Sequence, residues 1–374
     1  MLMSSVKTLE KSTKFIHASD IHLGCYQYQN EHLANDYILA FEEILSLAII
    51  QRVDFVLLGG DVFTSLDMLP GKLIKIIDLL VEFKNKTKNS IPIIAIEGNH
   101  DIRKYSRGKK FERGQSWLKI ISRIGLIILL DADLESSTDQ MYLPYDFKTQ
   151  KGGKIQIKDI VVYGNKYIGE KPIEYLPKIR DAIIKDDGLF HVLLQHFGIQ
   201  GQMKNVPGVE LKIVRTLKDR VNYLALGHYH KQFIIDGWIY NPGSSEAACS
   251  LDSLYERGIF LVEFNQNKFS KIRVQKIQLN NRKRVWKKVI FPVQFNRFGN
   301  IVIFVIKKLK SDLNLSTNCK PILYLVLKGQ KPKKFSKFDE KSLCKRILES
   351  FSLVDVKIFQ KFTNSIKTLD NYLQ

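Results

Sequence analysis

Five short groups of polar residues follow apolar runs in the first two-thirds of the sequence, and each contains aspartate, asparagine or histidine. These groups are Asp20-Ile21-His22, Gly60-Asp61, Gly98-Asn99-His100-Asp101, His196 after Leu193–Gln195, and Gly227-His228-Tyr229-His230. Carboxylate oxygens, one amide oxygen and imidazoles, with no thiolate among them, suit Mn, Fe, Mg or Zn. Seven candidate ligands exceed the needs of one ion and fit two ions that share a carboxylate. Each group alone is weak evidence, because a single strand-end histidine is more often a core or surface residue than a ligand.

The elements that must position these groups are alternating strands and helices. Strands are predicted at Lys14–Ile21, Val53–Phe63, Ile91–Glu97, Leu126–Leu130, Ile155–Tyr163, His191–His196, Tyr223–Leu226, Trp238–Tyr240 and Gly258–Phe264. Helices are predicted at Glu31–Arg52, Leu73–Lys84 and Ile173–Lys185. This pattern indicates an α/β fold, a two-sheet β-sandwich flanked by helices. Polar residues at strand ends then gather at a sheet edge, where α/β folds place their sites.

Composition is typical of a soluble globular protein, with 374 residues of which 45% are hydrophobic and 26% charged. Apolar runs such as Ile301–Ile306 are too short for a membrane helix, and Met1–Lys14 has no apolar stretch typical of a secretory signal. The four cysteines, Cys25, Cys249, Cys319 and Cys344, form no C-x-x-C pair. We therefore expect a cytoplasmic protein with reduced thiols and without a disulfide framework.

Positive charge is concentrated in the last third of the sequence. The formal net charge is +20, and the residues after 267 contribute +19 of it, with 25 basic and 6 acidic side chains. Dense basic runs lie at Arg282–Lys288 and Lys331–Lys337. This asymmetry favours a polyanion partner, first of all nucleic acid, whose counterions are released when lysine and arginine neutralise phosphates. An acidic membrane surface fits less well, because the runs lie on no obvious amphipathic helix. A solvated lysine-rich surface without a partner is the remaining alternative.

A domain boundary is predicted between Phe264 and Lys271, where asparagine and lysine replace apolar residues and the charge changes. A smaller α+β unit follows it. The segment 338–374 is predicted to be helical, because apolar residues recur in it every four positions. These residues are Leu343, Ile347 and Phe351. The predicted domains are residues 1–265, 266–335 and 336–374.

Taken in this order and at strand ends, the five groups resemble the calcineurin-like metallophosphoesterase superfamily, whose hallmark is D-x-H, G-D, G-N-H-[DE], H and G-H-x-H. The resemblance implies two divalent metal ions that activate a water for in-line attack on phosphorus. It implies Asp20, His22 and His230 as ligands of the first ion, Asn99, His196 and His228 as ligands of the second, and Asp61 as the bridge. His100 would hydrogen-bond or protonate the departing oxygen. Asp101 would either orient His100 or cap the following turn.

Within that superfamily the chain looks most like the double-strand-break repair nucleases of the Mre/SbcD type. The segments that carry this resemblance are Ser19–Gly24, Glu97–Asp101, Leu226–Lys231 and Asn241–Glu246. It implies a Mn²⁺-dependent, nucleoid-associated DNA nuclease with 3′–5′ exonuclease and single-strand endonuclease activity. It also implies a DNA-capping domain, a C-terminal helical segment that binds a Rad/SbcC-type ABC ATPase, and a homodimer formed through helices near Leu73–Lys84 and Ser116–Ile124. One departure is Thr64, where many relatives have a histidine that faces DNA. It leaves the balance of exonuclease and endonuclease activity open.

The basic second domain is predicted to hold duplex DNA by its phosphates, which position the substrate without reading its sequence. The candidate contacts are Arg282, Lys283, Arg284, Lys287 and Lys288. Trp286 would stack on DNA or pack in the core, and packing is the favoured interpretation. The C-terminal helix would dock on the ATPase or pack on its own domain. Two other functions compete: a small-substrate or cyclic-nucleotide phosphodiesterase, which needs no broad cationic surface, and a non-catalytic DNA-binding scaffold, which needs no complete ligand set.

Overall fold

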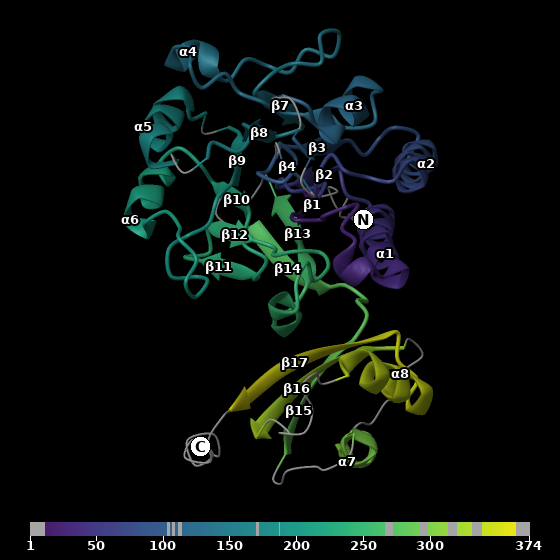
Figure 1. The fold of residues 1–374 in the computed structure, drawn as a ribbon. Helices are drawn as coiled ribbons and strands as arrows, with labels where there is room; N and C mark the ends of the chain where they lie inside the picture. The colour runs from purple at the N-terminus through teal and green to yellow at the C-terminus, as the bar shows by residue number, and fades with distance from the viewer. Residues whose placement is uncertain are drawn as a thin grey trace, which may run out of the picture. The chain divides into compact units, whose positions relative to one another are not determined.

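The computed structural model describes residues 12–102, 105–106, 109–110, 114–169, 172–186, 188–265, 272–291, 298–312, 320–330 and 339–363. The chain divides into two compact units, Met1–Asn280 and Asn281–Gln374 (Figure 1). None of the helices in these described ranges is long and apolar enough to cross a membrane.

The first unit contains two six-stranded sheets with a shared apolar core. The first sheet has the order β14-β13-β1-β2-β3-β6, and its neighbours from β1 to β6 are parallel. Its strands are β1 (Ser12–Ala18), β2 (Phe55–Leu58), β3 (Ile93–Ala95), β6 (Ile128–Leu129), β13 (Gly258–Asn265) and β14 (Ile272–Gln278). The second sheet has the order β11-β12-β10-β9-β8-β7. Its strands are β7 (Lys154–Ile157), β8 (Ile160–Gly164), β9 (Phe190–His196), β10 (Tyr223–Gly227), β11 (Phe233–Ile235) and β12 (Ile239–Asn241). A short hairpin, β4 (Tyr105–Ser106) with β5 (Lys109–Lys110), forms separately.

Buried aromatic side chains fill the space between the two sheets. Phe15 of β1 stacks on Phe55 of β2 at 4.9 Å between ring centroids, and Tyr223 of β10 stacks on Tyr240 of β12 at 4.2 Å. The edge of Tyr223 also contacts Phe15, so the two pairs form one layer. These strands are buried on both faces, which explains why their sequences are continuous apolar runs.

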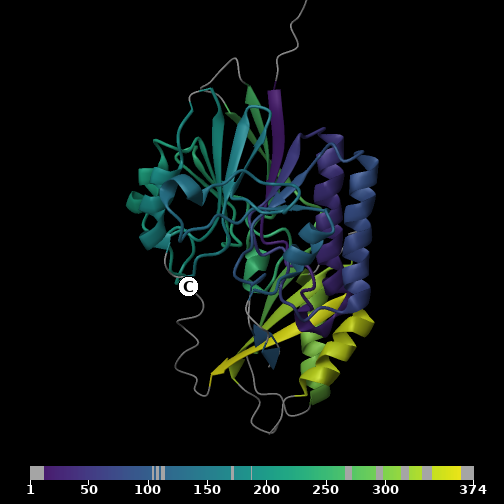
Figure 2. The same ribbon diagram turned by 90° about the horizontal axis from the view of Figure 1, so that it is seen from above.

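Helices cover the two outer faces of the sandwich (Figure 2). The first sheet packs against α1 (Glu31–Ile50), α2 (Pro70–Lys86) and α3 (Trp117–Arg123). The second packs against α4 (Thr138–Met141), α5 (Pro172–Ala182) and α6 (Leu211–Val214). Asn30 is the N-cap of α1, because its side chain accepts hydrogen bonds from the amides of His32 and Leu33. The predicted two-sheet α/β sandwich flanked by helices is confirmed.

The boundary between the units lies later than the sequence pattern indicates. Strand β14 pairs with β13 from Gly258↔Gln278 to Phe264↔Ile272, so it belongs to the first sheet. It is an edge strand in which exposed Lys276, Arg273 and glutamines alternate with half-buried apolar residues. This polar composition resembles the start of a basic domain, which is why the sequence places the boundary near residue 265 and the structure places it after Asn280.

The second unit is a three-stranded parallel sheet of order β15-β16-β17 that packs with two helices around one core. Its elements are β15 (Arg284–Phe291), α7 (Phe298–Asp312), β16 (Ile322–Gln330), α8 (Glu340–Ser350) and β17 (Asp355–Thr363). The apolar run Ile301–Ile306 lies in α7 and not in a strand. The segment 338–374, predicted to be helical, contains α8 and then β17, because its apolar spacing changes from four residues to two after Phe351. The basic run 331–337 and Cys319 lie outside the described residues.

Candidate metal centre

All seven predicted ligands lie together at the ends of strands from both sheets. Strands β1, β2 and β3 are parallel neighbours, so the loops that follow them leave the same edge of the first sheet. Strands β9 and β10 are parallel neighbours in the second sheet. The first sheet supplies Asp20, His22, Asp61 and Asn99, and the second supplies His196, His228 and His230. The amide of His228 donates to Oδ2 of Asp20 at 3.0 Å, which joins the two sheets directly at the site.

Four of these residues have left-handed backbone conformations. The φ angles are +52° at Asp20, +54° at His22, +50° at Asp61 and +90° at His228. Such angles are uncommon outside glycine and persist only where the surroundings enforce them, and they cluster at functional sites. Here the amide of Asp20 donates to the carbonyl of Gly60, and that of His22 to the carbonyl of Asp61, both at 3.0 Å. The loops after β1 and β2 therefore hold each other in this shape.

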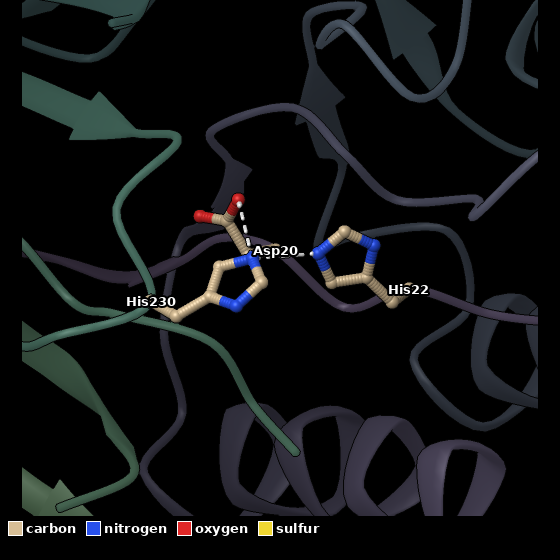
Figure 3. Close-up of side chains that lie close together, drawn as sticks. All are labelled: Asp20, His22 and His230. Atoms are coloured by element: carbon tan, nitrogen blue, oxygen red, sulfur yellow. Dashed lines mark hydrogen bonds and ion pairs between the residues drawn. The ribbon is translucent and has the colours of Figure 1, made fainter. Parts of the chain in front are cut away.

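The first group of candidate ligands is Asp20, His22 and His230 (Figure 3). The Nε2 atoms of His22 and His230 lie 3.0 Å apart, and Nε2 of His230 lies 3.9 Å from Oδ1 of Asp20. One ligand atom from each residue falls within 4.8 Å of the others. Asp20 and His22 are buried, so this cluster has little water to solvate it.

The second group surrounds Asn99. Oδ1 of Asn99 lies 3.1 Å from Nε2 of His196 and 3.0 Å from Nδ1 of His228. Nε2 of His196 also lies 3.4 Å from Oδ2 of Asp61. Asp20, Asp61 and His196 form a compact set of ligand atoms, so Asp20 takes part in both groups. The two groups thus share a carboxylate, while the bridging role of Asp61 stays a prediction.

The donor and acceptor pattern of these atoms fits cations. Nδ1 of His196 donates to the carbonyl of Gly59 at 2.7 Å, so in the neutral ring Nε2 carries a lone pair. That lone pair faces the oxygens of Asn99 and Asp61, which are acceptors as well. When His196 is neutral these acceptors converge with no donor between them, and either a proton or a metal cation in their midst satisfies them. Carboxylate, amide and imidazole ligands match the preferences of Mn, Fe, Mg or Zn.

The pKa shifts of the candidate ligands also indicate a site that favours cations. Burial by itself would lower the pKa of His196, but the Asp61 carboxylate beside it raises that pKa to about 9. Burial raises the pKa of Asp20, and it lowers that of His228 to about 4, with His196 adding to the second shift. The metal-free site therefore holds a proton on His196 against the aspartates. A divalent cation would displace that proton, because metal ligands bind in their deprotonated forms.

His100 lies beside these groups with one ring nitrogen already engaged. Its backbone amide donates to Oδ1 of Asp61 at 2.7 Å, and its Nδ1 lies 3.1 Å from the carbonyl oxygen of Thr64. Nδ1 therefore carries hydrogen as a donor, and Nε2 remains for chemistry. The ring lies 5.0 Å from that of His22. Thr64 donates its hydroxyl to the carbonyl of His22 at 2.9 Å.

Asp101 joins two of the ligand loops. Its carboxylate accepts from the amides of Gly98 and Phe63, both at 2.8 Å, and from that of Val62 at 3.3 Å. Of the two roles left open by the sequence, these bonds support capping of the turn after β3, extended to the loop after β2. Gly98 is required there, because a Cβ atom would lie 2.3 Å from both N and Oδ1 of Asp61. Contacts with Asp61 therefore restrict the backbone conformation of residues 98–101.

Comparison with known proteins agrees with this geometry. The calcineurin-like phosphoesterase family matches residues 13–232, which is more than half of the chain. The chain belongs to this family. As a member, this phosphoesterase is a metal-dependent hydrolase of phosphoesters.

The phosphoesterase is similar to two archaeal proteins named DNA double-strand break repair protein Mre11. The protein of Archaeoglobus fulgidus is 28% identical over 62% of this chain and 50% of its own length. The protein of Sulfurisphaera tokodaii is 26% identical over 85% of this chain and 74% of its own length. The chain therefore spans half of the first relative and most of the second. A solved dimetal phosphatase from Danio rerio is 8% identical over 71% of this chain and 95% of that chain, with a TM-score of 0.44.

Three residues at or near the phosphoesterase site were not among the residues predicted from the sequence. Asp252 lies 2.7 Å from Nδ1 of His230, although it follows no predicted strand. His17, inside β1, bonds to the Tyr223 hydroxyl at 3.0 Å and to the Leu226 carbonyl at 3.1 Å, and burial lowers its pKa to about 3. The ring of Tyr167 packs 6.0 Å from that of His228. Only Tyr167 could have been found by the rule that singled out the ligands, because it comes shortly after β8.

The candidate DNA contacts of the phosphoesterase lie in its second unit. Arg282 and Lys283 precede β15, and Arg284, Lys287 and Lys288 lie within it. Nη1 of Arg282 donates to the carbonyl of Lys320, and Nη1 of Arg284 to the hydroxyl of Tyr324, both at 2.8 Å. Trp286 packs against Tyr324 and stacks on Phe359, as the packing interpretation predicts. Lys288 is exposed.

Proposed function

We propose that this phosphoesterase is a Mn²⁺-dependent DNA nuclease that acts in double-strand-break repair, with 3′–5′ exonuclease and single-strand endonuclease activity. The observation that carries the proposal is the convergence of buried and half-buried acceptors from two sheets into two ligand groups. These groups share Asp20, and His100 lies beside them. The similarity to archaeal proteins named for double-strand-break repair supports DNA as the substrate.

In this mechanism Asp20, His22 and His230 would hold one divalent ion, Asn99, His196 and His228 would hold the other, and Asp61 would be the shared carboxylate. When bound, the two ions supply Lewis-acid catalysis and water activation for in-line attack on a phosphodiester. His100 would donate a proton from Nε2 to the departing oxygen, while its Nδ1 stays bonded to the carbonyl of Thr64. Asp101 keeps the loops after β2 and β3 together, so that His100 and Asp61 keep their spacing.

The charge of the second unit supports a polyanionic substrate. Residues 281–374 contain 21 basic and 6 acidic side chains, whereas a small phosphodiester would need no such surface. Lys288 is exposed and shares β15 with Lys287, so the unit presents cations that could contact phosphates. Such contacts fix the position of the nucleic acid without selecting its sequence.

We expect that replacing Lys287 and Lys288 together by alanine weakens DNA binding alike for unrelated sequences. The slope of log affinity against log salt should fall by about 2, since each phosphate contact contributes about 0.9. Fluorescence anisotropy over a salt series measures this slope in the full chain. Lys148→Ala, which removes an exposed lysine from the first unit, is the matched control. An unchanged slope in the double variant would mean that these lysines do not contact DNA.

The proposal includes two protein partners, an ABC ATPase and a second copy of this chain. An ABC ATPase of the Rad/SbcC type would bind elsewhere than on the apolar face of α8, because Leu343 and Ile347 are buried in the core of the second unit itself. A homodimer would form through α2 and α3, where several apolar side chains are exposed. These are Ile74, Val81, Ile120 and Ile124.

The experiment that tests the function is a cleavage assay on end-labelled duplex and single-stranded DNA with Mn²⁺, Mg²⁺ or EDTA. We expect hydrolysis with Mn²⁺ and none with EDTA, because the buried acceptors need cations to act. Cleavage of bis-p-nitrophenyl phosphate with both DNAs left intact would favour a small-substrate phosphodiesterase. Metal-loaded protein that hydrolyses neither substrate would support the scaffold interpretation.

A further inference from the structure

Asp252 contacts the candidate metal centre from a short 3-10 helix, η3 (Leu251–Leu254). Its Oδ2 atom lies 2.7 Å from Nδ1 of His230, on the side of the imidazole opposite to the other ligands. The same oxygen accepts from the backbone amides of Ala248 and Cys249, both at 3.1 Å. The side chain of Asp252 is buried, so the carboxylate is bound to the protein and not to bulk water.

The loop that carries Asp252 is braced by a nearly buried arginine. The guanidinium of Arg257 donates from Nη2 to the carbonyl of Asp252 and from Nη1 to the carbonyl of Tyr255 at 2.7 Å. Its Nε lies 3.8 Å from the carboxylate of Glu246, and these two side chains are only 9% and 1% exposed. Glu246 in turn accepts from the amide of Ala247 at 2.7 Å. The backbone around Asp252 therefore has little freedom to move its carboxylate away from His230.

The contact determines which ring nitrogen of His230 faces the other ligands. A carboxylate accepts hydrogen bonds, so Nδ1 of His230 must carry hydrogen and donate to Asp252. In the neutral ring Nε2 then has the lone pair, and Nε2 is the atom 3.0 Å from Nε2 of His22 and 3.9 Å from Asp20. Without Asp252 the ring could adopt the other tautomer or rotate, and either change would remove an acceptor from the first group.

We infer that Asp252 is a positioning residue for the first metal ion: its bond to Nδ1 holds His230 in the tautomer and orientation that present Nε2 as a ligand. The inference rests on the proposed function, because it assigns a supporting residue to the same centre. Carboxylates that orient metal-bound histidines affect affinity strongly, typically by about 10- to 100-fold when they are replaced. Asp252 does not contact the substrate in this assignment, so it is not a catalytic residue.

The test is a Mn²⁺ titration of chelator-treated, full-length Asp252→Asn by isothermal titration calorimetry. Asparagine keeps the shape of the side chain, removes the negative charge that holds hydrogen on Nδ1 of His230, and leaves one acceptor oxygen where the carboxylate has two. We expect two ions to bind the parent protein, and one of the two affinities to fall by about 10- to 100-fold in the variant. Glu256→Gln removes a charge from the same loop at an exposed position and should leave both affinities unchanged. Two unaltered affinities in Asp252→Asn would overturn the inference. A parent protein that binds no ion would overturn the proposed function itself.

A second measurement needs no variant. Long-range ¹H–¹⁵N NMR spectra of the metal-free protein, recorded at a pH where His230 is neutral, distinguish the two tautomers. We expect hydrogen on Nδ1 of His230, and hydrogen on Nε2 instead would overturn the inference. This measurement remains decisive if Asp252→Asn fails to fold. Thermal melting of metal-free Asp252→Asn and Glu256→Gln separates loss of fold from loss of metal affinity.

Discussion

Asp61→Asn is expected to lower kcat for phosphodiester hydrolysis on the order of a thousandfold, because the metal ions supply several kcal/mol of transition-state stabilisation. The substitution keeps the shape of the side chain. Oδ1 can still accept from the amide of His100, so the loop after β3 stays in place. What is lost is the charge beside Nε2 of His196.

The loss follows from the position of Asp61 in the second ligand group. In the parent protein this carboxylate raises the pKa of His196 against the effect of burial. Without it, Asp20 is the carboxylate left beside His196, and it alone must neutralise the ions in both groups. We therefore expect fewer than two ions per chain by elemental analysis after Mn²⁺ loading. Asp78→Asn, exposed on α2, removes the same charge far from the ligands and serves as the control. Two bound ions and parental kcat in Asp61→Asn would contradict the assignment of Asp61.

His100→Asn is expected to retain two ions per chain and to lower kcat on DNA by at least about a hundredfold, the usual scale for a general acid. The ions should stay because His100 belongs to neither ligand group. The loss should be smaller for bis-p-nitrophenyl phosphate, since a nitrophenolate departs without a proton. This difference between substrates separates proton donation from a purely structural effect.

Thr64→Ser is the matched control for His100. It keeps the carbonyl that bonds Nδ1 of His100 and the hydroxyl that bonds the carbonyl of His22, so kcat should stay near the parental value. If His100→Asn were as active as this control on DNA, His100 would have no part in proton transfer. An equal loss on both substrates would indicate that the residue only shapes the site.

The seven candidate ligands could be predicted from the sequence because the ends of strands are recognisable in it. Asp61 and His196 directly follow or close apolar runs, and parallel pairing of β1, β2 and β3 brings such ends to one edge. The seven candidates lie together in the structure, and their role as ligands stays a prediction. Asp252 could not be found in this way, because its relation to His230 depends on how the loop after β12 folds back.

Local sequence patterns predict some elements of the chain but not how those elements pack, as α8 and β14 show. Four-residue spacing of Leu343 and Ile347 correctly indicates α8, but whether that face binds a partner or its own sheet depends on tertiary packing, and it packs on its own sheet. Strand β14 is polar because it is an edge strand, and its place in the first sheet is set by pairing with β13. Composition alone therefore cannot distinguish such an edge strand from the beginning of a basic domain.

The aromatic layer between the two sheets has a consequence for reactivity. The first sheet supplies four of the candidate ligands and the second sheet supplies three. The thickness of the aromatic layer therefore determines the distance between these two sets of side chains. The stacked pairs Phe15–Phe55 and Tyr223–Tyr240 act as spacers. Interiors are close-packed, so a change of one methylene there shifts the sheets, and a misplacement of about 1 Å can reduce turnover roughly a hundredfold. Wholly apolar substitutions, remote from any phosphate, would thus tune the enzyme's catalytic rate.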